Sequence, residues 1–122
     1  MTNPAPITIY TDGACKGNPG PGGWAAILSY NGEEKELSGG EAQTTNNRME
    51  MTAVLRALQA LKKDHCNLQI FTDSKYVMNG MTQWLPGWRA KNFRRSNGKP
   101  VLNADLWEAL SAAAAPTIRS AV

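Results

Sequence analysis

Short apolar runs and sharp turns divide the first forty residues of the chain into three predicted strands. Residues 7–12 alternate between two faces, which is the pattern of a β-strand. A loop rich in glycine and proline is expected over residues 13–23, followed by a second strand over 24–30. Asn31-Gly32 is a strong hairpin signal, so residues 33–38 should return beside the second strand. The pattern predicts a three-stranded antiparallel meander, with the highly charged third strand near an edge.

A helical periodicity follows over residues 46–63, where apolar side chains recur on one face. Thr44 and Thr45 precede this segment and are good candidates for its N-cap. Lys62-Lys63 would close the helix favourably for its dipole. We therefore expect a long amphipathic helix after the meander, and its apolar positions are Met51, Val54, Leu55, Leu58 and Leu61.

The second half of the chain predicts one more strand and then shorter helices. Residues 68–73 indicate a strand, and Ser74 would cap a short helix through about residue 82. Pro86-Gly87 should break that helix, and residues 89–99 should be irregular or weakly helical. A last helix is expected over residues 103–115, ended by a proline.

Three acidic residues stand where this order of elements would bring them together. Asp12 and Asp73 each close an apolar run, and Glu50 lies in the first turns of the predicted helix. Singly, each has an ordinary interpretation, as a turn residue, an N-cap neighbour and a first-turn glutamate. A strand, a helical crossover and a parallel strand would place both aspartates at one sheet edge. Carboxylates held close together repel, so this spot indicates a site for divalent cations, where two ions would act on a phosphodiester.

Composition narrows the class of protein. The 122 residues are 42% hydrophobic, which is typical of one globular domain, and we expect a single domain over residues 1–122. The N-terminus shows no secretory signal and no run reaches membrane-spanning length, so a soluble, cytoplasmic protein is expected. Cys15 and Cys66 should be free thiols, and His65 should be an ordinary surface residue.

Positive charge is concentrated in one segment. The net charge is +3, but residues 84–99 carry five basic and no acidic side chains, so the remainder sums to −2 (3 − 5). Aromatic residues interleave with these cations, a pattern that suits nucleic-acid contact. The alternative is that the tryptophans form a small hydrophobic knob, and the two roles can coexist. The residues concerned are Trp84, Trp88, Arg89, Lys91, Phe93, Arg94, Arg95 and Lys99.

On these motifs the chain resembles the bacterial type 1 ribonuclease H family. The stretches that carry the resemblance are YTDGACKGNPGPGGW, NGEEKELSGG, TTNNRMEMTAVLRALQALK, IFTDSKYVMNGMTQW and NADLW, in family order over about residues 7–111. The resemblance implies an α/β, RNase H-like fold, in which the meander and one parallel strand form a mixed sheet packed by helices. It also implies an endonuclease that hydrolyses the RNA strand of RNA–DNA hybrids with two Mg²⁺ or Mn²⁺ ions, leaving 5′-phosphate ends.

The resemblance assigns roles residue by residue. Asp12, Glu50 and Asp73 match catalytic, metal-binding acids. Asn18, Asn46 and Asn47 match residues that read the minor groove of the hybrid, which fits recognition of the RNA 2′-hydroxyl. Thr45 matches a residue of the DNA-phosphate pocket, and residues 84–99 match a basic protrusion that grips the DNA strand. Lys75 stands where close relatives carry Gln, and it adds charge beside the site.

The resemblance ends before residues 115–122, where the family continues with a fifth strand, a His-bearing loop and a last helix that carries a fourth catalytic acid. We therefore expect reduced activity, a bare edge at residues 68–73 and a homodimer formed through that edge or by exchange of a C-terminal segment. A polar ligand such as Asn103 or Asp105 would then come from the tail or the partner chain. The alternatives are a hybrid-binding module with little or no catalysis, and a shortened product that folds poorly.

Overall fold

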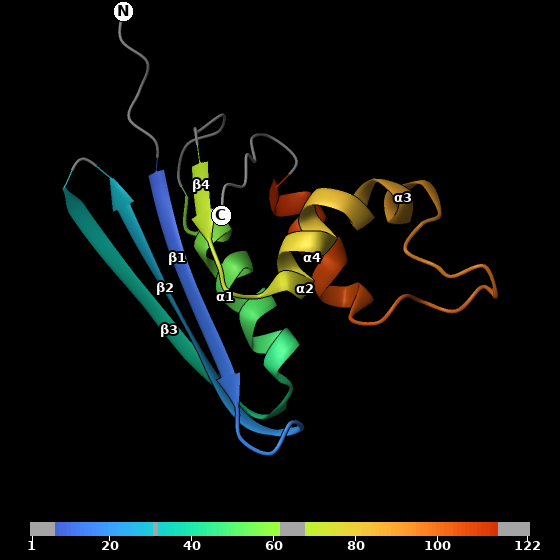
Figure 1. Cartoon of the computed structure of the whole chain (residues 1–122), viewed down its shortest axis with the longest axis horizontal. Helices are drawn as coiled ribbons and strands as arrows, with labels where there is room; N and C mark the ends of the chain where they lie inside the picture. Colours follow the sequence, from blue (N-terminus) through green and yellow to red (C-terminus); the bar gives the residue numbers. More distant parts are fainter. Residues whose placement is uncertain (1–6, 31, 62–67, 115–122) are drawn as a thin grey trace, which may run out of the picture.

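The computed structural model describes residues 7–30, 32–61 and 68–114, which contain a mixed four-stranded sheet with strand order β3-β2-β1-β4. Strands β1 (Ile7–Cys15), β2 (Gly20–Tyr30) and β3 (Glu33–Thr44) form an antiparallel meander. Strand β4 (Leu68–Phe71) runs parallel to β1. Figure 1 shows the sheet on one side of the molecule and the helices on the other. The predicted α/β architecture is confirmed, and the charged strand β3 does lie at an edge of the described sheet.

The predicted loop over residues 13–23 is wrong at both ends. Strand β1 continues to Cys15 and β2 begins at Gly20, so only residues 16–19 form the turn. Several residues in these added parts of β1 and β2 are glycines, because neighbouring atoms come too close to leave room for a side chain. A Cβ atom on Gly22 would stand 2.6 Å from the Thr44 side chain and 2.8 Å from the carbonyl oxygen of Ala14. Strand β3 is likewise longer than the predicted 33–38, and the predicted turn residue Asn31 lies outside the described residues.

Helix α1 (Asn46–Gln59) packs its apolar face against the sheet. Thr45 is the N-cap, and its hydroxyl oxygen accepts a hydrogen bond from the N–H of Arg48 at 3.2 Å, so this half of the cap prediction is confirmed. The helix ends four residues before the predicted end at 63, with Ala60 as its C-cap, while Lys62-Lys63 fall outside the described residues. The buried core beneath it is formed by Ile9, Ala26, Leu28, Met51, Val54, Leu55, Leu58, Leu68 and Ile70.

The chain after β4 forms a compact group of short helices beside α1 (Figure 1). Helix α2 (Lys75–Asn79) is capped by Ser74, as predicted, and continues into the π-helical turn η1 (Gly80–Trp84) and helix α3 (Leu85–Ala90). The predicted break at Pro86-Gly87 is wrong because the proline occupies the first turn of α3, where proline is tolerated. Helix α4 (Ala104–Ala114) closes the described chain.

Aromatic rings join these helices. Trp107 of α4 is fully buried, and its ring centroid lies 5.4 Å from that of Tyr76 and 5.2 Å from that of Trp88. Gly80 permits this packing, because a Cβ atom there would stand 2.0 Å from the Trp107 ring. Among the helices of the described chain, none is both long enough and apolar enough to span a membrane.

Candidate active site

Asp12 lies in β1, where the strand passes the first turn of α1. A Cβ atom on the next residue, Gly13, would stand 2.6 Å from the backbone nitrogen of Glu50 and 2.6 Å from the carbonyl carbon of Met49. Strand and helix therefore touch backbone to backbone, an approach that glycine makes possible. Asp12 is exposed, and its Oδ1 accepts a hydrogen bond from the N–H of Gly13 at 2.9 Å. The contact at Gly13 places Asp12 beside the helical turn that carries Glu50.

Asp73 is brought to the same end of the sheet by the register of β1 and β4. Tyr10 pairs with Phe71, and each aspartate follows its paired residue by two positions. The Thr11 hydroxyl donates to the carbonyl oxygen of Phe71 at 3.5 Å, which continues the contact beyond the last pair. Because the two strands are parallel and in this register, the end of β4 lies level with Asp12. The prediction that Asp12 closes its strand is wrong, because β1 continues to Cys15.

Asp73 lies in a turn between β4 and α2 that is held by two hydrogen bonds. The hydroxyl oxygen of Thr72 accepts from the N–H of Ser74 at 3.1 Å, and that of Ser74 accepts from the N–H of Val77 at 3.1 Å. Both hydroxyl residues are buried, whereas Asp73 and the following Lys75 are exposed. The turn therefore presents the charged side chains of Asp73 and Lys75 to solvent.

The backbone thus brings Asp12, Glu50 and Asp73 to the region where β4 ends beside β1, but their side chains do not form a closed cluster. Within residues 7–30, 32–61 and 68–114, no group of three or more His, Cys, Asp or Glu side chains is arranged to hold a metal ion. Their carboxylate oxygens are the donors that Mg²⁺ and Mn²⁺ prefer, so the chemistry of the donor set fits such ions. Like charges repel, which disfavours their convergence without a cation. The metal site stays a prediction.

The turn of residues 16–19 is tied to the start of α1 by two asparagines. Oδ1 of Asn18 accepts from the N–H of Asn46 at 2.9 Å, and Oδ1 of Asn46 accepts from the N–H of Cys15 at 2.7 Å. Asn18 has φ of +23° and precedes a cis peptide bond to Pro19. With both oxygens engaged, the two side chains retain NH₂ groups as donors. These predicted substrate residues therefore lie together, beside the turn that carries Asn47 and Glu50.

The basic segment over residues 84–99 consists of the end of η1, helix α3 and the turns that follow it, and most of its residues are exposed. The guanidinium of Arg94 donates to the carbonyl oxygen of Gly98 at 2.9 Å, and the N–H of Arg95 donates to that of Lys99 at 2.7 Å. The predicted irregular structure is confirmed past Ala90, where turns replace α3. The exposed cations are Arg89, Lys91, Arg94, Arg95 and Lys99.

The tryptophans of this segment pack together and also reach the surface. The rings of Trp84 and Trp88 have centroids 5.5 Å apart, and Trp84 also meets Tyr76 edge-on at 5.7 Å. The side chain of Trp84 is 36% exposed, while Trp88 is half-buried. The predicted hydrophobic knob is therefore present, and Trp84 keeps enough exposed surface for the predicted contact with nucleic acid.

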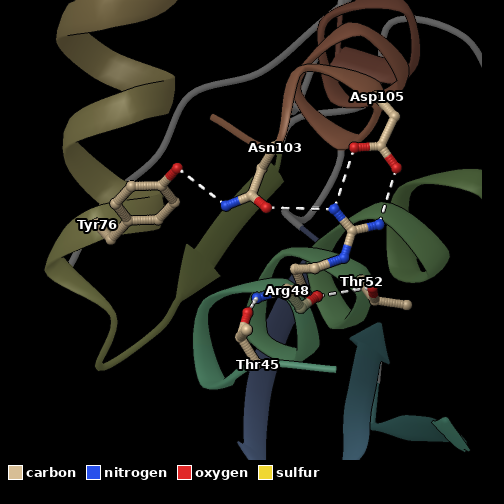
Figure 2. A network of polar contacts seen from close by, with 6 residues as sticks. All are labelled: Thr45, Arg48, Thr52, Tyr76, Asn103 and Asp105. Atoms are coloured by element: carbon tan, nitrogen blue, oxygen red, sulfur yellow. Dashed lines mark hydrogen bonds and ion pairs between the residues drawn. The ribbon is translucent and has the colours of Figure 1, made fainter. Parts of the chain in front are cut away.

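An ion pair between α1 and α4 was missed by the sequence analysis (Figure 2). Arg48 donates from both terminal nitrogens to Asp105, at 3.1 Å and 2.8 Å, and from one of them to Oδ1 of Asn103 at 3.2 Å. Asn103 in turn donates to the Tyr76 hydroxyl at 3.2 Å. Asn103 and Asp105, the candidate polar ligands, both accept hydrogen bonds from Arg48, and their role as ligands stays a prediction. No local pattern reveals this pair, because its members lie 57 residues apart.

The pair shifts both ionisation equilibria toward the charged forms. The hydrogen bonds from Arg48, helped by its charge, lower the pKa of the Asp105 carboxyl. The hydrogen bond to Asp105 raises the pKa of the Arg48 guanidinium in return. Asp105 also lies in the first turn of α4, where a negative charge favours the helix dipole. The start of α4 is therefore bound to α1 by charge.

Of the remaining predicted residues, Cys15 is a free thiol, as expected. Cys66 and His65 lie outside the described residues. The predicted edge position of β4 is confirmed for the described sheet, since β1 is its neighbour there. The structure contains a single chain, so the homodimer stays a prediction.

A meander, a crossover helix, a parallel strand and acidic residues near the end of that strand define a ribonuclease H-like α/β protein. Two solved structures share this fold. The structure described as LC9-RNase H1, a type 1 RNase H with the type 2 active-site motif, matches with a TM-score of 0.80 and 29% identity, over 99% of this chain and 65% of its own. LC11-RNase H1 in complex with an RNA/DNA hybrid matches with a TM-score of 0.71 and 25% identity, over 94% of this chain and 83% of its own.

The family itself follows from the sequence comparisons. The model of the RNase H family matches residues 4–119, so the chain belongs to the RNase H family. Ribonuclease H of Methylobacillus flagellatus is 64% identical over 104 residues, which are 85% of this chain and 68% of that protein. Ribonuclease H of Cupriavidus metallidurans is 58% identical over 110 residues, which are 90% of this chain and 75% of that protein. The predicted family and fold are confirmed.

Proposed function

We propose that the chain is an endonuclease that hydrolyses the RNA strand of RNA–DNA hybrids. The proposal is supported by the backbone positions of Asp12, Glu50 and Asp73 around the end of β4, which follow from the register of β1 with β4 and from the contact of Gly13 with α1. Membership of the RNase H family supports the reaction, and a related protein was solved with an RNA/DNA hybrid bound.

The three carboxylates would hold two Mg²⁺ or Mn²⁺ ions together with the substrate. When bound, such ions stabilise the charge of the reacting phosphate and make water a stronger nucleophile. Asp12 and Asp73 are exposed and Glu50 is partly buried, so all three can turn toward bound ions and substrate. Hydrolysis that leaves the phosphate on the downstream fragment would give 5′-phosphate and 3′-hydroxyl ends.

Substrate recognition would use the surface around the three acids. The free NH₂ groups of Asn18 and Asn46, with Asn47, would donate to acceptors in the minor groove of the hybrid. Thr45 would approach a DNA phosphate while its hydroxyl oxygen caps α1. The segment over residues 84–99, together with Lys75, would bind the DNA strand through its positive charge.

The test is cleavage of a hybrid with a labelled RNA strand, in Mg²⁺ and in Mn²⁺, with RNA and DNA duplexes as control substrates. Asp12→Asn keeps the size of the side chain but removes its charge. We expect it to slow cleavage by about 10²–10⁴-fold, the range for loss of a catalytic group, and to leave hybrid binding within about twofold. The matched control is Glu36→Gln on the exposed edge strand β3. Equal cleavage by wild type and Asp12→Asn would refute the assignment.

A hybrid-binding module with little catalysis is the second candidate. The observation that favours it is the exposed basic and aromatic surface over residues 84–99, which would bind a hybrid whether or not the three acids hold ions. In that case the wild type would bind the hybrid in EDTA but would not cleave it with either metal. End analysis of any products, by phosphatase sensitivity of the 5′ end, decides the chemistry.

A homodimer formed through β4 extends the proposal. Strand β4 is an edge of the described sheet, and edges with unpaired backbone groups favour pairing with another chain. Sedimentation velocity at micromolar concentration should give the mass of a dimer, whereas a compact monomer would contradict the pairing. The cytoplasmic location stays a prediction.

A further inference from the structure

We propose that Arg48 is a positioning residue, which holds the first turn of α1 in place through its contacts with Asp105 and Asn103 on the far side of the helix. That turn carries Asn46 and Asn47 and leads directly into Glu50, so the inference rests on the proposed function for its effect on cleavage. It makes a separate claim about the structure, which can be tested without substrate.

Both the backbone and the guanidinium of Arg48 make hydrogen bonds. Its backbone N–H is capped by Thr45 at 3.2 Å, and its carbonyl oxygen accepts from the Thr52 hydroxyl at 2.7 Å (Figure 2). The guanidinium meets both oxygens of Asp105, in the two-pronged geometry that makes arginine–carboxylate pairs specific in direction. The side chain therefore links the first turn of α1 to the start of α4.

The hydrogen-bond donors allow one arrangement of this network. Arginine only donates, so Oδ1 of Asn103 must face Arg48, and Nδ2 must face the Tyr76 hydroxyl. Trp107 also only donates, and its Nε1 contacts the same hydroxyl at 3.1 Å. Asn103 has φ of +59°, a left-handed conformation that asparagine tolerates. Because Arg48 only donates, it fixes which group donates and which accepts in the chain of hydrogen bonds that runs from α1 to α2.

This link lies opposite the contact between α1 and β1. On one side the backbone of Glu50 rests on Gly13, and on the other Arg48 is bound to α4. The side chain of Asp105 is 66% exposed, and exposed ion pairs add little to stability. The main effect of the pair should therefore be on the position of the turn.

Three variants test this role. Arg48→Met keeps the aliphatic stem and removes the donors, and Asp105→Asn removes the partner charge. The control is Arg56→Met on the same helix, because Arg56 is exposed and contacts Gln59 within α1. For both Arg48→Met and Asp105→Asn, we expect hybrid Kd in EDTA and the Mg²⁺ concentration for half-maximal cleavage to rise about threefold to tenfold, the cost of a misplaced group. Their Tm should fall by only about 2–4 °C, and Arg56→Met should change Kd and the Mg²⁺ requirement less than about twofold.

Asp105→Asn separates positioning from direct contact. Removal of an acid strengthens binding of a polyanion in general, and it would also release Arg48 to bind a phosphate. Positioning predicts the opposite, which is weaker binding. Equal or tighter binding by Asp105→Asn would overturn the proposal, as would an Arg48→Met protein that loses only Tm.

Amide hydrogen exchange keeps this test independent of the proposed function. In the free protein, exchange over Asn47–Glu50 should be about twofold to fivefold faster in Arg48→Met and Asp105→Asn than in Arg56→Met, because the turn opens more often. If the wild type cleaves no hybrid while exchange still changes in this way, the proposed function fails and the positioning role stands. Unchanged exchange would refute the positioning role whatever the activity.

Discussion

The start of α1 has charged side chains on two sides, and only those on the α4 side contact one another. Toward the sheet, Asp12, Glu50 and Asp73 are brought together by the backbone, yet in the described chain their side chains make no closed cluster. Toward α4, Arg48 and Asp105 are joined by paired hydrogen bonds. The difference is one of charge, since opposite charges with matched donors attract each other, whereas three carboxylates need a cation to converge.

The comparison also shows two uses of a strongly charged residue. Loss of one of the three acids should change chemistry and leave the fold intact, because they contribute no mutual attraction. Loss of Arg48 or Asp105 should change the position of a helical turn. Stability measurements on the glycines and charges that support each side can sharpen this contrast.

The largest effect on stability is expected from Gly13→Ala, on the side of the acids. Its methyl group would stand 2.6 Å from the backbone of Met49 and Glu50, and neither β1 nor α1 can move without disturbing the core. We expect a loss of about 3 kcal/mol, at the upper end of overpacking costs, together with slower cleavage because α1 is displaced. Urea unfolding measures the first effect.

The control for Gly13→Ala is Gly23→Ala on the adjoining strand, where the new methyl group would make an ordinary 3.4 Å contact with Gly39. This variant should lose less than about 1 kcal/mol. Equal losses from the two variants would show that the close approach at Gly13 does not hold the acids in place.

Gly80→Ala should be the next most costly change, on the α4 side. The methyl group would overlap the buried Trp107 ring, at 2.0 Å, and this cost exceeds the roughly 1 kcal/mol that alanine adds to helix stability. We expect a net loss of about 2 kcal/mol in urea unfolding. Gly87→Ala is the matched control, because nothing lies within 4 Å of its new methyl group, and an unchanged Gly80→Ala protein would contradict the packing.

The smallest effect is the acid sensitivity of the Arg48–Asp105 pair. The pKa of Asp105 is lowered in the folded protein, so the pair's contribution is fully present above the unfolded pKa of about 4 and is lost as pH falls through the folded pKa. The free energy of unfolding of wild type minus that of Asp105→Asn should therefore shrink below about pH 4, by less than about 1 kcal/mol because the pair is exposed.

Screening gives a second measure of the same pair. The difference between wild type and Asp105→Asn should also decrease in about 1 M NaCl, where the Debye length is about 3 Å. A difference that persists unchanged at low pH and in high salt would show that Asp105 acts through packing rather than through charge.

Much of the molecule follows from short-range patterns. The alternation of residues 7–12, the periodicity of α1 and the Thr45 and Ser74 caps were all predictable, because each depends on neighbours within a few residues. The backbone proximity of Asp12, Glu50 and Asp73 was predictable as well, because a strand, a helix and a parallel strand allow few arrangements, although β1 does not end at Asp12.

What the tertiary structure alone decided are features that depend on distant partners. Strands β1 and β2 extend through the predicted glycine loop because α1 and β3 pack against those glycines, and Pro86-Gly87 lie inside a helix. Arg48 finds Asp105 across 57 positions in the chain. Local pattern is encoded in neighbouring residues, whereas close backbone approach and charge pairing arise only when separate elements are brought into contact.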